Sequence, residues 1–392
     1  MFVRTLVRLV RYLVRQRGAQ LLRTLPPAAE VAILDATNYQ DMVALCGGET
    51  FVVVDPNGPQ LHLTAGLFLS ALKWTFKTGL PEAGYAIALL EKIDPAITIT
   101  LIDNARLSYE VSRHFTRGRF LAIQNAARFD TAHLPPDLAR AVHLREFACF
   151  GQYEVDLYQQ KGATVGRFYP LGALKDSFYR ARRAPGVAPV INDICVVAEP
   201  SPGWDQLEYP GMEDAIGNIA KYAVRFGREH NKRVRIAGKR SVDAPQRPSE
   251  VAWYEKYVGR EIEVSPRVRD EFTTYQLIDQ SEISIAFISS ALQEGVARGN
   301  RVLFCNYTGQ ERWNFPVPGI WQLTEPGYEA FEKRLLELLA MSPEEFRAAS
   351  RDARQYVMEY DEKMPTHVFL QNLIAGAVSD RKVQKVQNNN VQ

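Results

Sequence analysis

Short apolar runs alternate with stretches of helical periodicity along the chain from about residue 30 onward. Apolar runs of about four to eight residues are typical of buried strands, and apolar residues three and four positions apart indicate helices. The predicted strands are 31–34, 51–54, 97–102, 120–123 and 144–150 in the first half, then 194–198, 234–237, 283–287 and 302–305 in the second. Helical stretches such as 63–75 and 105–115 lie between them. Because such alternation builds parallel sheets, we predict an α/β protein of two Rossmann-like parallel-sheet domains.

The chain length and two changes of composition predict the domain limits. At 392 residues the chain exceeds what one hydrophobic core normally supports. A basic stretch with two prolines and a glycine, KDSFYRARRAPGVAP, favours an exposed linker at 175–190. It would join an N-terminal domain, 27–174, to a C-terminal domain, 191–378, which ends in helices. The polar residues 379–392 are expected to be a disordered tail.

The first 25 residues, MFVRTLVRLVRYLVRQRGAQLLRTL, contain no acidic residue. Arg4, Arg8, Arg11 and Arg15 would share one face of a helix, with an apolar face beside it. We predict a basic amphipathic helix within 1–26 that binds an anionic membrane surface through residues 1–25. Two alternatives remain open: a helix that packs on the protein body with solvated arginines, and a mitochondrial transit peptide.

The composition is that of a globular protein and gives no sign of nucleic-acid binding or of a membrane span. Hydrophobic residues make up 46% and charged residues 23%, as in globular proteins, and the net charge of +2 does not favour nucleic acid as a partner. The four cysteines lack metal-site spacing and are expected to be buried and reduced. No apolar run reaches the length of about 18 residues that a membrane span needs. We expect a cytoplasmic protein, peripheral on the inner face of the plasma membrane.

Ligands of open parallel sheets bind at the carboxyl ends of strands, so polar residues there are candidate site residues. In ISIAFISSALQEGVARGNRVLFCN, Ser289 and Ser290 end a strand, and Gln293 and Glu294 follow in the next helix. The amides of a helix start suit phosphate, and a carboxylate accepts hydrogen bonds from a ribose. The alternative is an ordinary capped helix with a favourable dipole partner.

Two basic residues, Lys239 and Arg240, directly follow the strand at 234–237. There they can neutralise a donor phosphate, although solvation alone also accounts for such residues. The loop AEPSPGWD, 198–205, follows the first strand of the second half and favours a turn near the same ligand. We therefore expect donor binding by Lys239, Arg240, Ser289, Ser290, Gln293 and Glu294.

The first half carries its own polar residues in TLIDNARLSYEVSRHFTRGRFLAIQNAARFD. Asp103 and Asn104 follow a strand and are expected to project into the interdomain crevice, where a carboxylate can act as general base. Capping of the helix at 105–115 is the alternative. Gln124, Asn125 and Arg128 follow the next strand, on what we expect to be the acceptor side.

Two resemblances give these patterns a meaning. The set Ser289, Ser290, Glu294, Gly295, Ala297 and Gly299 resembles the C-terminal domain of nucleotide-sugar glycosyltransferases of the GT-B architecture. The set Asp103, Asn104, Gln124, Asn125 and Arg128 resembles a bacterial surface carbohydrate biosynthesis family, with Ala126 where that family usually has glycine. Together they imply a GT-B-like fold with the nucleotide-sugar donor bound by the C-terminal domain.

The predicted function is transfer of a sugar from a nucleotide-sugar to a glycan or lipid-linked acceptor of surface polysaccharide assembly. Retaining enzymes of this fold often carry two glutamates, but Ala286 stands eight residues before Glu294, which favours inversion. We expect no cofactor and no metal, because the chain has no H-E-x-x-H, Walker or G-x-G-x-x-G motif in the required context. A sugar-nucleotide epimerase of the same fold and a non-catalytic scaffold of an assembly complex are the alternatives.

Overall fold

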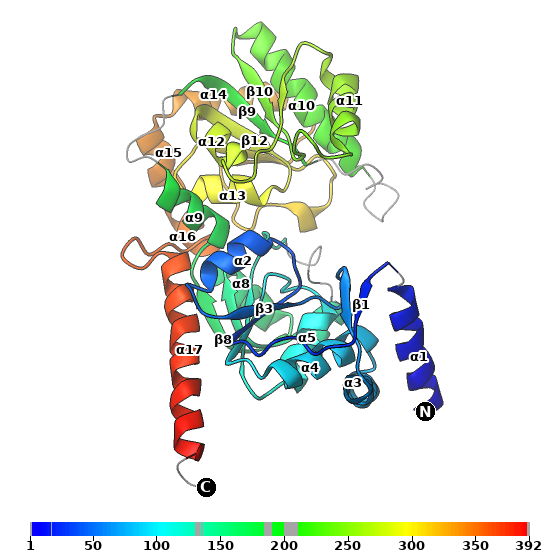
Figure 1. Cartoon of the computed structure of the whole chain (residues 1–392). Helices are drawn as coiled ribbons and strands as arrows, with labels where there is room; N and C mark the ends of the chain where they lie inside the picture. Colours follow the sequence, from blue (N-terminus) through cyan, green and yellow to red (C-terminus); the bar gives the residue numbers. More distant parts are fainter. Residues whose placement is uncertain are drawn as a thin grey trace.

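The computed structural model describes residues 2–16, 18–129, 134, 136–183, 190–199 and 211–389. Two domains stack end to end, each built on a six-stranded parallel sheet (Figure 1). The strand orders are β3-β2-β5-β6-β7-β8 in the N-terminal domain and β11-β10-β9-β12-β13-β14 in the C-terminal domain. The α/β fold with two parallel sheets is therefore confirmed.

The N-terminal sheet contains every strand predicted in the first half and one more. Its strands are β2 (Val31–Leu34), β3 (Phe51–Val54), β5 (Ile97–Thr100), β6 (Arg119–Ile123), β7 (His143–Cys149) and β8 (Thr164–Pro170). The helices are α2 (Tyr39–Leu45), α3 (Ala65–Thr78), α4 (Pro81–Ile93), α5 (Arg106–His114), α7 (Pro136–Ala141) and α8 (Gln152–Gln160). Strand β8 escaped prediction because it is a half-exposed edge strand without an apolar run.

The C-terminal sheet has buried central strands and two very short edge strands. Its strands are β9 (Asn192–Val197), β10 (Val234–Ala237), β11 (Val264–Ser265), β12 (Ser281–Ala286), β13 (Val302–Cys305) and β14 (Gln322–Leu323). The helices are α10 (Met212–Glu229), α11 (Arg247–Val258), α12 (Thr273–Asp279), α13 (Ser290–Ala297), α14 (Tyr328–Ala340), α15 (Pro343–Ala349) and α16 (Arg351–Val357). Strands β11 and β14 are too short to leave a sequence pattern.

The predicted exposed linker is largely a buried helix, α9 (Leu174–Arg182). Asp176 of α9 is fully buried and pairs with Arg298, which also reaches Asp279 of α12 at 2.8 Å. The expectation of an exposed connection is thus wrong for residues 175–180, which are buried or partly buried, because Asp176 pairs with Arg298 of the C-terminal domain. Residues 181–183 are exposed, as expected. Residues 184–189 lie outside the described part of the chain.

The last helix, α17 (Thr366–Asn389), returns to the N-terminal domain and runs along it (red in Figure 1). Its apolar side chains Leu370, Ile374, Ala377 and Val378 join the core that contains β2 and β5. The prediction of a disordered tail from residue 379 is wrong through Asn389. Ion pairs hold this end: Arg381 lies 2.7 Å from Asp94, and Lys382 lies 3.5 Å from Glu49.

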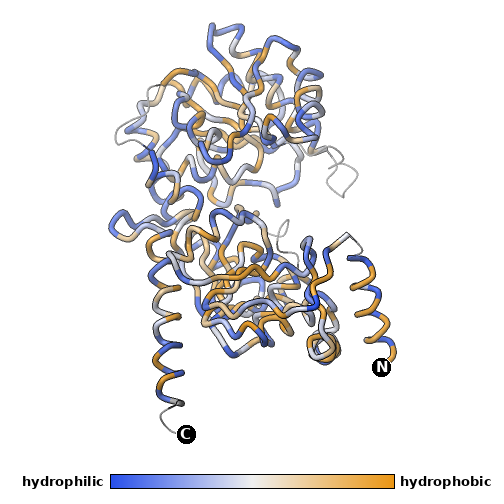
Figure 2. Tube along the Cα trace, viewed as in Figure 1, coloured by the Kyte–Doolittle hydropathy of each residue, from blue (hydrophilic) through white to orange (hydrophobic). Residues whose placement is uncertain are grey.

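The N-terminal helix α1 (Phe2–Arg15) packs on the body of the N-terminal domain. The strand that follows it, β1 (Gln20–Leu22), pairs in parallel with β4 (Gln60–His62). Its exposed residues include the apolar Phe2, Val3, Val7, Val10 and Val14. Figure 2 shows the apolar positions of this helix in orange. Within the described residues, no helix combines the length and apolar character needed to cross a bilayer. All four cysteines are buried and free, as predicted.

Candidate functional site

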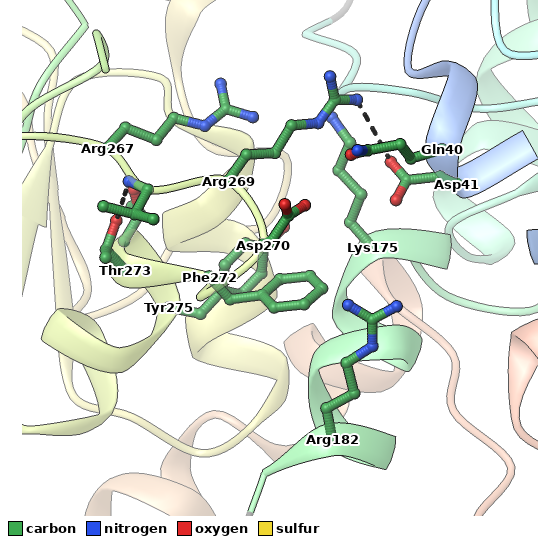
Figure 3. A pocket seen from close by; sticks show the side chains of 12 residues that line it. Gln40, Asp41, Lys175, Arg182, Arg267, Arg269, Asp270, Phe272, Thr273 and Tyr275 are labelled. Carbon is green, nitrogen blue, oxygen red and sulfur yellow. Dashed lines mark hydrogen bonds and ion pairs between the residues drawn. The ribbon is translucent and has the colours of Figure 1, made fainter. Parts of the chain in front are cut away.

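A cavity of about 340 Å³ lies between the two domains. The loop that follows β11 and the start of α12 form one wall, α9 forms the second, and α2 of the N-terminal domain forms the third (Figure 3). The charged residues that line it are Lys175, Arg182, Arg267, Arg269, Asp41 and Asp270. Four cations against two carboxylates leave this cavity with a net positive charge, which suits an anionic ligand.

Lys175 is the most enclosed of these cations. It stands at the start of α9, and burial lowers its pKa, as do Arg267 and Arg269, while Asp41 and Glu294 oppose the change. Arg269 reaches across from the C-terminal domain: its guanidinium donates to Asn38 Oδ1 at 2.7 Å and lies 3.8 Å from the Asp41 carboxylate. The cavity is therefore closed on one side by a polar contact between the domains.

Glu294 lies behind this cavity and interacts with two of its lining residues. Burial, and then the neighbouring Asp176, raise the pKa of Glu294 to about 8, while the Tyr275 hydroxyl, Arg298 and Lys175 lower it. Its Oε2 atom has no hydrogen-bond partner among the described residues. An unsatisfied polar atom this deeply buried costs free energy, and this oxygen would gain from a hydrogen bond to a ligand, although Glu294 is 3% exposed and is not part of the cavity lining.

Lys239 and Arg240 extend the positive surface from the end of β10. Their backbone N–H groups both donate to the carboxylate of Glu250, at 2.7 and 3.2 Å, which fixes the turn. Arg267 N donates to the Arg240 carbonyl at 2.9 Å and so ties this turn to the cavity wall. Burial, and then Arg240, lower the pKa of Lys239.

The turn between β12 and α13 is held by residues of both domains. Glu199, at the end of β9, accepts hydrogen bonds from the backbone N–H groups of Phe287 and Ile288, both at 2.8 Å. Burial raises the pKa of Glu199 to about 7. Ser290 Oγ accepts from the Ala127 N–H of the N-terminal domain at 2.8 Å. The predicted donor-side and acceptor-side motifs thus meet at this hydrogen bond.

Two predicted donor residues have different surroundings. Ser289 is the N-cap residue of α13, although its side chain makes no capping hydrogen bond. Gln293 is fully buried, and its amide lies 3.4 Å from the Val357 carbonyl of α16. Its side chain therefore packs between α13 and α16. Of the loop predicted at 198–205, residues 200–205 lie outside the described part of the chain.

Asp103 is not exposed to a crevice, so that prediction is wrong. The side chain is fully buried and forms an ion pair with Arg128, and the Tyr158 hydroxyl lies 3.4 Å away. The Arg128 guanidinium also donates to the Ala126 carbonyl at 2.7 Å. This enclosed pair holds the loop that receives Ser290, and burial keeps the Asp103 carboxylate, including its unpartnered Oδ1, away from an acceptor. Neither Asp103 nor Asn104 caps α5, whose N-cap is Ala105.

Gln124 belongs to the same buried framework. Its amide nitrogen donates to Glu154 Oε1 at 2.9 Å, and its oxygen accepts from the Phe150 N–H at 2.9 Å. Burial raises the pKa of Glu154 to about 7. Asn125 is partly exposed and Asn104 is exposed, so these two remain accessible at the strand ends of the N-terminal sheet.

Comparison with known proteins identifies the architecture. No protein-family model matches the chain, and no curated protein matches it. Among solved structures, a putative UDP-N-acetylglucosamine 2-epimerase from Listeria monocytogenes superposes with a TM-score of 0.56 at 11% identity, covering 91% of this chain and 97% of that one. MnaA of S. aureus with UDP gives 0.54 at 10% identity, with coverage of 88% and 94%. The wall teichoic acid polymerase TagF gives 0.53 at 12% identity, with coverage of 97% and 98%. The chain has the GT-B fold.

In this GT-B chain, the cations that line the cavity were not predicted from the sequence. Lys175, Arg182, Arg267 and Arg269 stand in basic, polar segments that are typical of solvated surface. No local pattern distinguishes them, because their common location results from packing α2, α9 and the loop after β11 together. Arg267 follows β11, which ends at Ser265, but this strand is too short to leave a sequence pattern that would point to Arg267.

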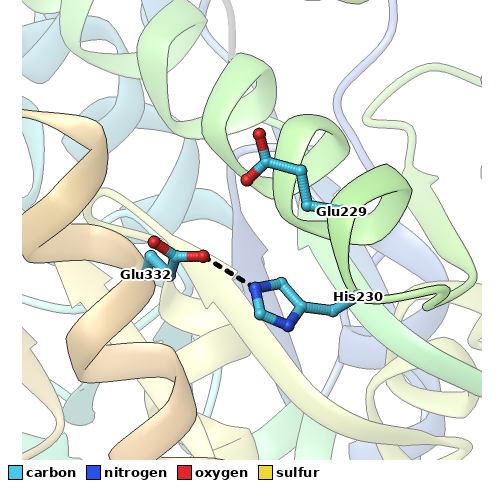
Figure 4. A group of neighbouring side chains, drawn as sticks. All are labelled: Glu229, His230 and Glu332. Carbon is cyan, nitrogen blue, oxygen red and sulfur yellow. Dashed lines mark hydrogen bonds and ion pairs between the residues drawn. The ribbon is translucent and has the colours of Figure 1, made fainter.

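One group of residues in the described part of the chain has metal-ligand geometry: Glu229, His230 and Glu332, whose candidate ligand atoms lie within 4.8 Å of one another (Figure 4). His230 Nε2 lies 2.7 Å from Glu332 Oε1. Glu229 is already engaged by Arg225 at 2.8 Å and by the Tyr328 hydroxyl. The group joins α10 to α14, outside the cavity, and ordinary hydrogen bonds account for it.

Proposed function

We propose that this GT-B chain is a glycosyltransferase that takes its sugar from a nucleotide-sugar donor. The observation that carries the proposal is the cationic cavity at the carboxyl end of β11, between the two domains. Cations in a partly enclosed site bind a diphosphate and stabilise the negative charge that develops on it as the glycosidic bond breaks. Two of the structural neighbours support a nucleotide ligand, since MnaA was solved with UDP and TagF with CDPG.

The donor would lie with its diphosphate against Lys175, Arg267 and Arg269. Lys239 and Arg240 adjoin this wall and would extend it. The ribose hydroxyls would face Glu294, whose carboxyl has an oxygen without a partner among the described residues. The Ser289 and Ser290 amides at the start of α13 would add hydrogen-bond donors for phosphate oxygens.

The acceptor would approach from the N-terminal domain, where Asn104 and Asn125 are accessible. We propose an inverting mechanism, in which the acceptor hydroxyl attacks the anomeric carbon, its proton passes to water or to the departing diphosphate, and the bond between the sugar and the nucleoside diphosphate breaks. A glycan or lipid-linked acceptor fits the proposed location, the inner face of an anionic membrane reached through residues 1–25. Asp103 is not proposed as the base, because its carboxylate is buried and forms an ion pair with Arg128.

An epimerase acting on a nucleotide-sugar is the second candidate. The observation in its favour is the superposition on the putative UDP-N-acetylglucosamine 2-epimerase over almost the whole of both chains. An epimerase needs no acceptor, so the two functions differ in a product assay. Incubation with nucleotide-sugar alone would yield an isomeric nucleotide-sugar for an epimerase, whereas a transferase would release nucleoside diphosphate and form a glycosylated product when an acceptor is added.

Ligand-induced stabilisation tests the proposal. A ligand that binds only the folded state at one hundred times its Kd stabilises it by about 2.7 kcal/mol, which is visible as a higher Tm. We expect one of UDP, CDP, GDP, ADP or dTDP to raise the Tm, and Lys175→Ala to weaken its binding by roughly 10-fold to 100-fold, the worth of a charge-assisted hydrogen bond. Lys333→Ala, on the exposed face of α14, is the matched control. No response to any nucleotide would contradict the proposal.

A further inference from the structure

One face of α1 packs against the N-terminal domain. Leu9 is fully buried, and the Tyr12 hydroxyl donates to the Pro56 carbonyl. Leu6 and Leu13 are partly buried against the same core. These four side chains fall on one side of the helix, because an α-helix turns once every 3.6 residues. They anchor α1 and are not available to a second partner.

Two further stripes of α1 remain on the outside. The valine stripe consists of Val3, Val7, Val10 and Val14, which are 69%, 40%, 42% and 45% exposed. The arginine stripe consists of Arg4, Arg8, Arg11 and Arg15, all exposed. No acidic residue offsets these charges within the helix. Exposed apolar side chains beside a row of cations match the surface of an anionic lipid leaflet.

The neighbouring helix α3 exposes apolar side chains of its own. Leu69 is 65% exposed and Phe76 is 45% exposed. Lys73 and Lys77 stand beside them, with their ammonium groups 5.2 and 4.7 Å from the Trp74 ring centre. A shallow, open depression lies beside Leu69, and its lining is mostly apolar: Leu63, Thr64, Ala65, Phe68 and Leu69. Such a hollow accommodates part of an acyl chain.

The order of side chains around α1 places its valine stripe next to α3. Tyr12 is the anchoring residue nearest the arginine stripe, and its ring lies 6.1 Å from that of Tyr85 in α4. Besides α4, α1 packs against α3. Since Tyr12 faces α4, we infer that Leu6 and Leu13, at the other edge of the buried face of α1, lie on the side of α3. The valine stripe continues from that edge. Figure 1 shows α1 and α3 beside each other at the outer side of the N-terminal domain.

We propose that the valine stripe of α1 and the Leu69 and Phe76 face of α3 form one docking surface for an anionic phospholipid bilayer. The inference rests on the membrane association in the proposed function and adds α3 to it. Insertion of the apolar side chains and attraction of the arginines both contribute, and each basic side chain at an anionic surface raises partitioning about fivefold. Soluble nucleotide binding does not depend on this surface.

Vesicle sedimentation with the full chain tests this surface. We expect binding to vesicles of phosphatidylglycerol and phosphatidylcholine, weaker binding to pure phosphatidylcholine, and a further loss in 0.5 M salt. The variant Leu69→Ser with Phe76→Ser should bind about 5-fold to 10-fold more weakly, as should Val7→Ser with Val14→Ser. A matched control is Val242→Ser with Leu336→Ser, which changes residues 71% and 45% exposed in the C-terminal domain and should bind like the wild type.

The outcomes separate the two levels of the proposal. Wild-type binding with an undiminished α3 variant would overturn the role of α3 and limit docking to α1. Absence of wild-type binding to anionic vesicles would overturn membrane association altogether, while the Tm response to nucleotides would still decide the glycosyltransferase assignment. An equal loss in the control variant would mean that any exposed apolar side chain drives binding, which also contradicts a defined surface. Circular dichroism verifies that each variant is folded.

Discussion

Two polar clusters stand at strand ends of this molecule, and they differ in how their charges are used. In the N-terminal domain, Asp103 and Arg128 form a pair with almost no exposure to solvent. In the interdomain cavity, Lys175, Arg267 and Arg269 face open volume with too few carboxylates to neutralise them. Asp103 follows an apolar run in the sequence, whereas Lys175, Arg267 and Arg269 stand in basic, polar segments, and in neither case does the local sequence reveal whether a charge is paired. The difference teaches that a polar strand end alone does not distinguish a structural ion pair from a binding site, and that unneutralised charge is the feature on which the proposed anionic site rests.

The largest effect is expected from breaking the enclosed pair. Asp103→Asn leaves the Arg128 guanidinium buried without a counter-charge, and removal of one partner of a buried pair typically costs about 3–5 kcal/mol. We expect a loss of stability of this size in urea unfolding, and unchanged nucleotide affinity in the protein that remains folded. Asn104→Ala, at the neighbouring exposed residue, should change stability by less than about 0.5 kcal/mol. If the Asp103→Asn protein were as stable as the wild type but had no transferase activity, Asp103 would be a functional residue and not part of a structural ion pair.

A pH effect of intermediate size is expected from Glu294. Its folded pKa of about 8 lies above the usual 4.5, so between these values the folded chain holds a proton that the unfolded chain releases. Stability should therefore fall as the pH rises from about 5 to 8 and then level off. Glu294→Gln removes this dependence, and one pKa unit corresponds to about 1.4 kcal/mol. We expect the stability difference, wild type minus variant, to fall by up to about 4 kcal/mol between pH 5 and pH 9.

Paired thermal unfolding across this pH range isolates the Glu294 contribution. The groups that face its carboxyl are Lys175, Asp176, Tyr275 and Arg298, and all are retained in the variant. Glu154 and Glu199, whose pKa values are also raised by burial, are present in both proteins and cancel in the difference. A difference that does not change with pH would mean that Glu294 is ionised in the folded protein.

The smallest effect is expected from Asp41, which faces the same cations as the proposed ligand. Its carboxylate lies 3.8 Å from Arg269 and interacts with Lys175. A bound diphosphate would compete with it, and a partly exposed ion pair is worth about 0–1 kcal/mol. We expect Asp41→Asn to raise nucleotide affinity about twofold to fivefold in titration calorimetry. Asp380→Asn, at an exposed residue of α17, is the control. Weaker binding would indicate that Asp41 orders the cavity.

Much of the fold, and less of the site, was predictable from the sequence. Buried strands such as β2 and β13 leave continuous apolar runs, so their positions matched the structure. Helices α9 and α17 were misjudged because the partners of Asp176 and Arg381 are distant in sequence: Arg298 and Asp94. Asp103 was misjudged for the same reason, since a strand-end carboxylate looks identical whether it faces solvent or Arg128. Local patterns in a single sequence do not reveal ion pairs between residues that are far apart in the chain.

The return of α17 to the N-terminal domain has a consequence for how the protein is made. Leu370 and Ile374 fill the core of a sheet whose first strand begins at Val31, so that core stays incomplete until α17 has been synthesised. The C-terminal domain has all of its strands and the helices α10 to α16 before then, and its assembly can precede completion of the other half. Such distant contacts slow folding and leave apolar surface exposed during synthesis. A fragment that stops at the end of α9 would expose the apolar surface that α17 covers in the full chain, and we expect it to aggregate.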